Sequence, residues 1–533
     1  MPDDISVHAA KRRTFAIISH PDAGKTTLTE KFLLFSGAVV EAGAVRARDG
    51  RRSARSDWME MERQRGISIS STALKFTYRD HTFNLLDTPG HRDFSEDTYR
   101  VLAAADAVIM VLDIAKGIES QTLKLFEVSR EQHLPIITFL NKCDRPGRDP
   151  IELLDEIESM ISLTPAPVTW PVGIPGAVQG VIDRSTDEYI AYERTARGAT
   201  IGREHRETIN SLDTSDVEVA RALDEIALFD AVDANFDSAK FLQGTQTPVF
   251  VGSALTNFGV GGLLDAVIDL APAPSARVTQ SGSARPLDAP FSGFVFKIQA
   301  NMNPSHRDHV AFVRVCSGEF ERGMVLQHTQ TGRPFPTKYA TSMFGAERDT
   351  VEVAYPGDIV GLVNASELQI GDTLYIGEPV EFPPMIAFPP ELFAWAHVSD
   401  TSKSKQFRRG LVQLAREGVV QVFHDPWGDT TPMLGAVGTM QFEVLEYRMA
   451  QEFGAGVRLS HTAYKFVRRT DERTADALRR ISGVAIVQRE DDAWLALFEN
   501  EYRLERLAQE HKDWTLERLL NHTGAIPRSV PSH

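Results

Sequence analysis

The stretch Thr14–Thr27, TFAIISHPDAGKTT, constrains the fold more than any other part of the chain. It starts with a short apolar run, Phe15–Ile18, that suits a buried strand, and a polar turn ending in Gly24-Lys25-Thr26 follows. Apolar residues then recur at helical spacing until Gly37. Strand, loop and helix in this order predict a phosphate-binding loop, because the amides at a helix N-terminus favour an anion.

The loop departs from the regular phosphate-loop pattern at Ser19, where the pattern has glycine. An ordinary strand-to-helix turn is the alternative at this point, and the later motifs decide between the two. In the nucleotide-binding interpretation, Lys25 reaches the β- and γ-phosphates and the Thr26 hydroxyl holds Mg²⁺.

A long segment without clear periodicity, Ser36–Ile67, follows the first helix. Loops of this length in a compact domain are usually functional or disordered, so the segment is either an insertion or a nucleotide-sensing loop. It runs into Ser68, whose hydroxyl is a candidate to complete the Mg²⁺ shell.

The strand expected at His81–Leu86 is followed directly by the motif Asp87-Thr88-Pro89-Gly90-His91. Asp87, at the C-terminal end of a parallel strand, is a candidate to hold Mg²⁺ through water. Gly90 leaves its amide free to approach the γ-phosphate, and His91 is placed to orient the attacking water. A solvated loop histidine is the alternative for His91.

Helices and strands alternate after this motif and predict a parallel α/β sheet with its sites at the strand C-termini. The expected elements are a helix at Phe94–Ala105, a strand at Ala107–Leu112, a helix at Ser120–Glu131 and a strand at Pro135–Leu140. The last strand ends in Asn141-Lys142-Cys143-Asp144. Asp144 can accept two hydrogen bonds from guanine that adenine cannot offer, Asn141 can hold the loop, and the Lys142 stem can cover the base.

One more wall of the base pocket is expected after the strand Thr247–Val251, where the small residues of Gly252-Ser253-Ala254-Leu255 let a backbone amide reach guanine O6. The chain between Asp144 and Ser253 is longer than a minimal nucleotide-binding domain needs, which predicts an inserted subdomain at about 150–245. The candidate GTP-binding residues are Ser19, His20, Pro21, Asp22, Ala23, Gly24, Lys25, Thr26, Thr27, Asp87, Thr88, Pro89, Gly90, His91, Asn141, Lys142, Cys143, Asp144, Ser253, Ala254 and Leu255. The candidate metal ligands are Thr26, Ser68 and, through water, Asp87, and the candidate catalytic residue is His91.

Composition and periodicity change twice more along the chain. A Pro-rich linker at Ala271–Pro274 is followed by alternating apolar runs separated by turn residues, which predict an antiparallel β-barrel. Helical periodicity returns after Phe388-Pro389-Pro390. The chain is therefore expected to be multidomain: a P-loop α/β GTP-binding domain with the insertion at 1–277, the β-barrel domain at 278–388 and an α+β domain at 389–533.

Two amphipathic helices are expected in the last domain, and their apolar faces contain Phe407, Leu411, Leu414 and Ala415 in the first and Phe442, Leu445, Met449 and Phe453 in the second. The first helix also carries basic residues, which form either a solvated face or a contact with RNA. Strands are expected at Gly456–Leu459 and Trp494–Phe498, and a charged helix at Glu501–Leu520.

Charge and composition exclude several classes of protein. The formal net charge of −16 disfavours a protein that coats naked nucleic acid, so DNA is not an expected partner. Only two cysteines occur, which fits a reducing compartment, and the N-terminus lacks the apolar core of a signal peptide. We expect a cytoplasmic protein without a membrane segment, and a monomer.

The ordered set SHPDAGKTT, RGISIS, DTPGH, NKCD and GSAL resembles the translational GTPases, among them elongation factors Tu and G. In these relatives the first phosphate-loop glycine is often replaced, as at Ser19, and most carry threonine where this chain has Ser68. The resemblance also implies that His91 activates or positions water. The three-part layout and the segment AVGTMQFEVLEYRM are most similar to the bacterial class II release factors.

That resemblance implies a ribosome-dependent GTPase of translation termination, which binds GTP, GDP and Mg²⁺. Its implied partners are the ribosome, through ribosomal RNA and protein, and the class I release factors, whose dissociation it promotes after peptide release. The alternatives are another translational GTPase, either an elongation or a ribosome-protection factor, which the chain length disfavours, and a non-catalytic GTP/GDP sensor.

Overall fold

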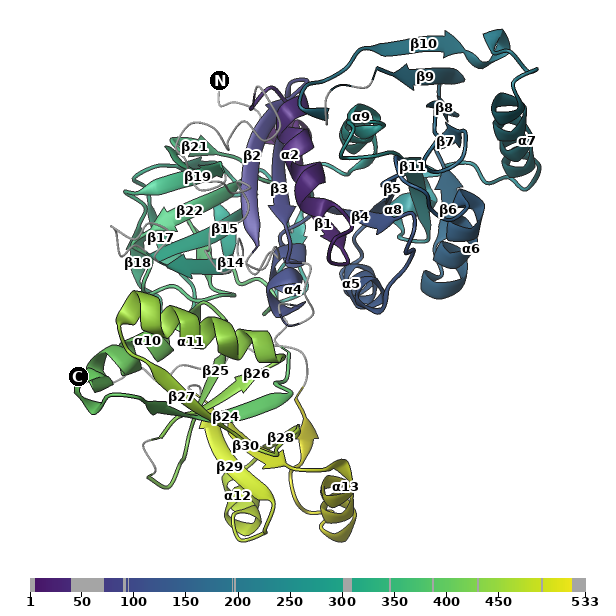
Figure 1. Ribbon diagram of the computed structural model, residues 1–533. Coiled ribbons are helices and arrows are strands. Elements are labelled where there is room, and N and C mark those ends of the chain that lie inside the picture. The colour runs from purple at the N-terminus through teal and green to yellow at the C-terminus, as the bar shows by residue number, and fades with distance from the viewer. Residues whose placement is uncertain are drawn as a thin grey trace.

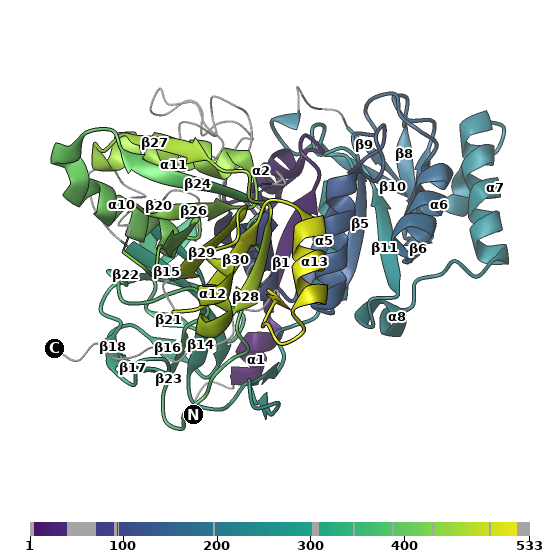
Figure 2. The same ribbon diagram turned by 90° about the horizontal axis from the view of Figure 1, so that it is seen from below.

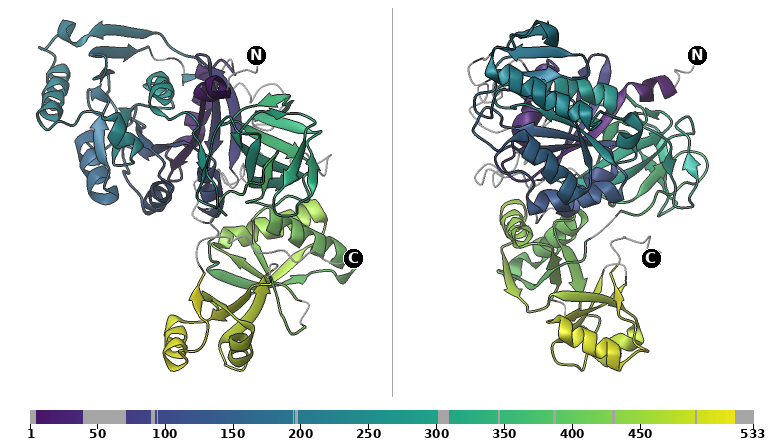
Figure 3. Two further views of the ribbon diagram at one scale, coloured as in Figure 1. Left: turned by 180° about the vertical axis from the view of Figure 1, so that it is seen from behind. Right: turned by 90° about the vertical axis from the view of Figure 1, so that its right-hand side faces the viewer.

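The computed structural model describes residues 5–39, 71–89, 93, 95–193, 195, 198–300, 309–344, 347–385, 388–428, 431–489 and 492–519. Figure 1 shows an α/β domain that continues on one side into an inserted sheet and packs on the other against a curled antiparallel sheet. A third domain lies below these two, and both views of Figure 3 show it in that position. Within these ranges, none of the helices combines the length and apolar composition that crossing a bilayer requires.

A seven-stranded sheet in the order β2-β3-β1-β4-β5-β11-β6 forms the core of the first domain. All neighbours pair in parallel except β2 with β3. The strands are β1 (Arg12–Ser19), β2 (Thr72–Tyr78), β3 (His81–Asp87), β4 (Ala107–Asp113), β5 (Ile136–Asn141), β6 (Thr164–Pro167) and β11 (Gln246–Val251). Its helices are α1 (Ile5–Ala10), α2 (Lys25–Phe35), α4 (Ser95–Ala103), α5 (Ser120–Glu131), α6 (Pro150–Ile161) and α9 (Val260–Leu270). The predicted strands and helices of this domain are confirmed to within a few residues.

Both faces of the sheet are covered by helices, which explains the near-continuous apolar strands. Phe15 and Ile17 of β1 pack in one core cluster with residues of α2 and α9. Ala16 and Ile18, which point to the opposite face, pack in a second cluster with residues of α4, α5 and α6. This sandwich places the C-terminal ends of β1, β3 and β5 at one edge, where the predicted motifs begin.

The inserted region contributes to two sheets. Its first strand, β6, follows α6 and belongs to the main sheet, and its later strands form a four-stranded antiparallel sheet in the order β10-β9-β8-β7. These elements are β7 (Thr169–Val172), β8 (Gly180–Asp183), β9 (Glu188–Tyr192), β10 (Glu204–Thr208), α7 (Val217–Ala231) and α8 (Ser238–Leu242). The buried Trp170 fastens α7, because its ring packs edge-on against Phe229 and its indole nitrogen donates to Glu225 at 2.7 Å. Figure 2 shows α7 at the end of the molecule opposite to the third domain.

The second domain is a curled antiparallel sheet in the order β18-β17-β23-β14-β15-β22-β19-β20. Its strands are β14 (Ser292–Ala300), β15 (His309–Ser317), β17 (Val325–His328), β18 (Pro334–Pro336), β19 (Ala340–Phe344), β20 (Glu347–Thr350), β22 (Ile359–Val363) and β23 (Thr373–Tyr375), accompanied by the short pairs β12 (Arg277–Val278) with β13 (Ala284–Arg285) and β16 (Phe320–Glu321) with β21 (Val353–Ala354). Alternate residues of β15, among them Ala311, Val313 and Val315, fill its interior. The predicted antiparallel β architecture is confirmed, whereas the exact domain boundaries stay a prediction.

The third domain combines a second eight-stranded antiparallel sheet, in the order β27-β24-β26-β25-β29-β30-β28-β31, with helices. Its strands are β24 (Leu392–Val398), β25 (Gln421–His424), β26 (Met433–Ala436), β27 (Val457–His461), β28 (Phe466–Thr470), β29 (Val484–Arg489), β30 (Trp494–Phe498) and β31 (Glu517–Arg518). Its helices are α10 (Ser404–Arg416), α11 (Thr439–Phe453), α12 (Glu472–Leu478) and α13 (Glu501–Glu510). The apolar stripes predicted for the first two helices pack on the sheet, which confirms the α+β prediction.

The predicted closing helix at Glu501–Leu520 is wrong in its second half. Helix α13 ends at Glu510, and the His511 ring stacks on the Trp514 ring at 3.8 Å between centroids. Trp514 and Leu516, two residues apart, then pack against the core cluster beneath α12 and α13, and β31 pairs with β28. A continuing helix could not turn these two side chains back toward that core.

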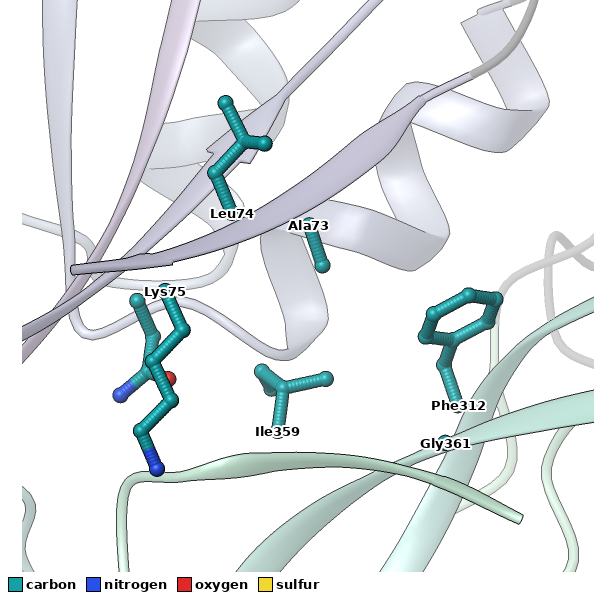
Figure 4. A pocket seen from close by; sticks show the side chains of 7 residues that line it. Ala73, Leu74, Lys75, Phe312, Ile359 and Gly361 are labelled. Carbon is teal, nitrogen blue, oxygen red and sulfur yellow. The ribbon is translucent and has the colours of Figure 1, made fainter. Parts of the chain in front are cut away.

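The first two domains meet around a buried carboxylate, Asp358. Its oxygens accept from Arg12 Nε at 2.8 Å and lie 3.0 Å from Lys75 Nζ, so β1 and β2 of the first domain both bind it. Figure 4 shows Lys75 and Ala73 facing Ile359 and Phe312 across this interface. The cavity between them is only about 10 Å³, roughly the room for one water molecule, so the two domains are closely packed here.

We expect Asp358→Asn to lower the free energy of unfolding by about 1–3 kcal/mol, because Arg12 and Lys75 lose their buried counter-charge. Burial alone would raise the pKa of Asp358, but Lys75 and Arg12 outweigh it and hold the pKa below its ordinary value. A depressed carboxyl pKa stabilises the fold above the unfolded-state value of about 4 and loses that contribution as the pH falls further. Urea unfolding at pH 7 and about pH 3.5 should show the difference between wild type and variant shrinking on acidification.

The matched control for this prediction is Glu352→Gln, since Glu352 pairs with Arg322 on the exposed surface of the same domain. Exposed pairs contribute little, so this variant should unfold like wild type. An Asp358→Asn protein that is as stable as the control at pH 7 would contradict the role of the buried carboxylate.

Candidate nucleotide-binding site

The phosphate-binding loop lies at the C-terminal end of β1 and runs directly into α2. Gly24 is the N-cap of α2 and has a φ of +100°, a left-handed conformation that glycine adopts without strain. A Cβ at Gly24 would overlap Nδ2 of Asn141, so the close approach of the two segments also requires glycine. The loop therefore places the amides that begin α2 directly after the C-terminal end of β1, where an anion site is expected.

Asn141 joins the three segments that the sequence assigned to one nucleotide. Its side-chain amide donates to the Ala23 carbonyl at 2.7 Å, and its side-chain oxygen accepts from the Ala254 amide at 2.8 Å. Asn141 is buried at the C-terminal end of β5, where the sheet fixes its position. One side chain thus sets the distance between the phosphate loop and the predicted wall of the base pocket.

The predicted guanine-recognition residues lie together. Asp144 accepts a hydrogen bond from the Ser253 hydroxyl at 2.6 Å, and the Cys143 amide donates to the Gly252 carbonyl at 3.1 Å. Cys143 is buried, and burial raises the pKa of its thiol to about 12, so it serves packing rather than reactivity. Leu255 remains 44% exposed beside the buried Ala254.

Lys25 and Asp87 form a buried ion pair at 2.5 Å, between the start of α2 and the end of β3. The adjacent Thr88 hydroxyl donates to the Ile17 carbonyl at 2.6 Å, which ties the DTPGH motif to β1. The half-buried hydroxyl-bearing residues Thr26 and Thr27 follow Lys25 in the first turn of α2.

The oxygen donors of Thr26 and Asp87 fit Mg²⁺, which proteins usually hold with one or two side chains together with phosphate and water. Across the part of the chain that the structure describes, no group of three or more His, Cys, Asp and Glu side chains is arranged to hold a metal by itself. A shared protein–phosphate site is compatible with both observations.

Three of the predicted residues, Ser68, Gly90 and His91, lie outside the described residues, as does most of the predicted nucleotide-sensing segment. The other phosphate-loop residues, Ser19, His20, Pro21, Asp22 and Ala23, lie between β1 and α2 as expected. His20 is buried with Nδ1 3.1 Å from Glu119, and burial lowers the pKa of its imidazole although Glu119 opposes this.

Sequence analysis did not single out Asp113, which holds the Lys142 side chain. The Lys142 ammonium lies 2.8 Å from Asp113 and also donates to the Asp22 carbonyl, so it bridges β4 and the phosphate loop. Burial raises the pKa of Asp113, but hydrogen bonds from Lys142 and the Ala115 amide reverse this and lower it overall. Its position at the C-terminal end of β4, in register with Asn141, was the available signal.

Comparison with known proteins places the chain in a family. Residues 10–273 match the elongation factor Tu GTP binding domain, and residues 290–377 match elongation factor G domain 2. Residues 382–508 match the C-terminal domain of class II release factor RF3. A curated peptide chain release factor 3 from Synechocystis sp. is 46% identical, over 99% of this chain and 97% of its own length. The chain belongs to the peptide chain release factor 3 family.

Two further members of the peptide chain release factor 3 family agree with this. The protein of Gloeobacter violaceus is 51% identical over 84% of this chain and 86% of its own length. The protein of Microcystis aeruginosa is 47% identical over 94% of this chain and 93% of its own length. A solved structure from Thermus thermophilus covers 92% of this chain and 73% of its own, with a TM-score of 0.70 at 23% identity, and supports the fold alone.

Family membership identifies the chain as a GTPase of translation termination and implies that its GTP-binding domain binds a guanine nucleotide. It also implies an interaction with the ribosome. The RF3 C-terminal domain distinguishes it from an elongation or ribosome-protection factor, which is not favoured.

Proposed function

We propose that this GTPase is stimulated by the ribosome and uses GTP to promote dissociation of class I release factors after peptide release. The observation that carries the proposal is the match of residues 382–508 to the class II release factor domain, in one chain with a match to a GTP-binding domain at residues 10–273. The protein is expected to act as a monomer in the cytoplasm.

In this proposal the described residues bind and orient GTP. Lys25 leaves Asp87 to contact the β- and γ-phosphates, and the α2 amides bind phosphate oxygens. Asp144 accepts from the guanine N1–H and amino group, the Lys142 stem covers the base, and the Ser253–Leu255 amides reach O6. Asn141 keeps the two halves of the site at a fixed distance.

Thr26, Ser68 and, through water, Asp87 would hold Mg²⁺, which supplies positive charge to the phosphates when bound. The Gly90 amide approaches the γ-phosphate and His91 positions the attacking water. Phosphoryl transfer depends mainly on positioning and charge stabilisation, so hydrolysis is expected to be slow until the ribosome stimulates it.

A direct test uses ribosomes stalled after peptide release with a fluorescently labelled class I factor bound. Adding this protein with GTP should accelerate loss of the label relative to buffer, and omission of nucleotide should reduce the acceleration. Unchanged retention of the label, together with ribosome-stimulated GTP hydrolysis, would contradict the release-factor role while leaving the GTPase intact. Binding without multiple-turnover hydrolysis would instead favour a GTP/GDP sensor.

A further inference from the structure

One backbone carbonyl of the inserted region, that of Gly198, is bound by two buried side chains of the nucleotide-binding domain. Nδ2 of Asn257 donates to the Gly198 carbonyl at 3.0 Å and to the Thr200 carbonyl at 2.8 Å. The Lys31 ammonium of α2 donates to the same Gly198 carbonyl. Hydrogen bonds from a charged donor are stronger than neutral ones. The inserted region is therefore attached to the first domain by directional bonds.

Gly198 also lies directly against the predicted wall of the base pocket. A Cβ at Gly198 would overlap the Leu255 carbonyl oxygen and would come within 2.9 Å of Lys31 Nζ. Its φ of +62° is a left-handed conformation that also favours glycine. Leu255 is one of the three residues whose amides are expected at guanine O6, and Asn257 follows it by two positions. The inserted segment thus packs on the wall itself.

A second contact joins the inserted sheet to the same loop. The Tyr192 ring of β9 packs edge-on against the Phe258 ring at 4.8 Å between centroids. The Phe258 carbonyl accepts from the Ser253 amide at 2.8 Å, which closes the loop that carries the wall. Strand β9 pairs with β10, which follows Thr200 by a few residues, so both contacts come from one end of one sheet. Figure 1 shows this sheet beginning beside α2 and α9 and extending away from them.

The wall is bound differently along its length. Asn141 and Asp144 of the first domain bind its beginning, through the Ala254 amide and the Ser253 hydroxyl. Leu255 comes next, and its side chain is 44% exposed, so packing of that side chain contributes little to fixing it. The position of Leu255 therefore depends on the contact with Gly198.

We propose that the inserted sheet determines how tightly a guanine nucleotide is held, and that Asn257 and Gly198 are the positioning residues through which it acts. Together they keep the wall amides in place for guanine O6. The apparent affinity of a pocket falls in proportion to the fraction of time for which it is correctly formed, so losing these bonds weakens binding without any change at the phosphates. This inference rests on the proposed function, since it takes the Ser253–Leu255 wall as guanine-binding.

The test compares two substitutions that break the contact from opposite sides, Asn257→Asp and Gly198→Ala. Aspartate keeps the shape of Asn257 and adopts its φ of +68° readily, but it replaces the donor with an acceptor that faces two carbonyls. Alanine at position 198 adds a Cβ where the Leu255 carbonyl lies. Each variant is expected to release fluorescent GDP about tenfold faster than wild type in a chase with unlabelled GDP, because two buried hydrogen bonds are worth about that factor.

A nucleotide without O6 separates positioning of the wall from a general loss of structure. The diphosphate of 2-aminopurine riboside has hydrogen at that position, so it cannot accept from the wall amides. Its affinity, measured by competition with fluorescent GDP, should change by less than about twofold in both variants, because the contact that they disturb is already missing. A general loss of structure would weaken both nucleotides equally.

Each variant has a counterpart elsewhere that repeats the chemical change without the contact. Asn364→Asp lies at an exposed position of the second domain with a φ of +62°. Gly244→Ala lies just before β11, with a φ of +71° and no atom within 4 Å of an added Cβ. Both counterparts should release GDP at the wild-type rate.

Three results would overturn the inference: wild-type release of GDP in either test variant, equally fast release in its counterpart, or equal losses of affinity for GDP and for the 2-aminopurine nucleotide. A wild-type protein that binds the 2-aminopurine nucleotide as tightly as GDP would instead contradict the base pocket, and with it the proposed function.

Discussion

Replacing Asp144 by asparagine is expected to convert a GTP-binding protein into one that prefers xanthosine triphosphate. Asparagine keeps the shape of Asp144 and can still accept from the Ser253 hydroxyl, which lies 2.6 Å away. It presents an amide to guanine groups that need acceptors, whereas the 2-oxo group of xanthine can accept from that amide. A site built on such hydrogen bonds rejects a partner that cannot form them by about 10⁴–10⁵-fold, so GTP affinity should fall by up to that factor.

The measurement is a competition titration of GTP and xanthosine triphosphate against fluorescent GDP on the same preparation. Asp155→Asn, at an exposed position of α6, makes the same chemical change away from the site and should keep the GTP preference. An unaltered ratio of the two affinities in Asp144→Asn would contradict the assignment of the base pocket.

The elements that sequence analysis predicted best are those buried on both faces. Every residue of β4 is buried, as is every residue of β5, and this leaves continuous apolar runs that few other structures produce. The ordered motifs at the ends of such strands could be placed because parallel strands end at one edge of the sheet.

The two edge strands of the main sheet were not predicted, for physical reasons. Strand β2 pairs only with β3 in the main sheet and mixes buried and half-exposed residues, so it has no strong periodicity. Strand β6, at the opposite edge, contains Pro165 and Pro167. Proline has no amide hydrogen to donate, so it argues against a strand except at an edge, where no neighbouring strand needs that donor. Both assignments depend on neighbours that are distant in the sequence.

For the candidate site, motif order predicted residues that the structure brings together, but it did not predict how they pair. Gly24, Asn141 and Asp144 follow from motif order, because the motifs that contain them predict contacts with phosphate and guanine, and those contacts stay a prediction. The bonds from Asn141 to Ala23 and from Lys142 to Asp113 depend on the register between separate strands. The hydrogen bond from the Met440 amide of α11 to Asp93 also depends on how two domains pack, which no local pattern encodes.

Replacing His91 by alanine is expected to abolish most ribosome-stimulated hydrolysis while leaving nucleotide binding intact. The predicted contacts with guanine and the phosphates come from other residues, so affinity for GDP should change little. Loss of a group that positions or activates water lowers the chemical step by about 10²–10⁴-fold. Single-turnover hydrolysis of labelled GTP with saturating ribosomes measures that step directly.

The control for His91 is His81→Ala, because His81 lies at the opposite end of β3 and contacts the Arg79 carbonyl through Nδ1 at 2.9 Å. It removes an imidazole from the same strand-and-loop unit without touching the C-terminal edge of the sheet, so its single-turnover rate should equal that of wild type. If His91→Ala also hydrolyses GTP at the wild-type rate, another group must position the water.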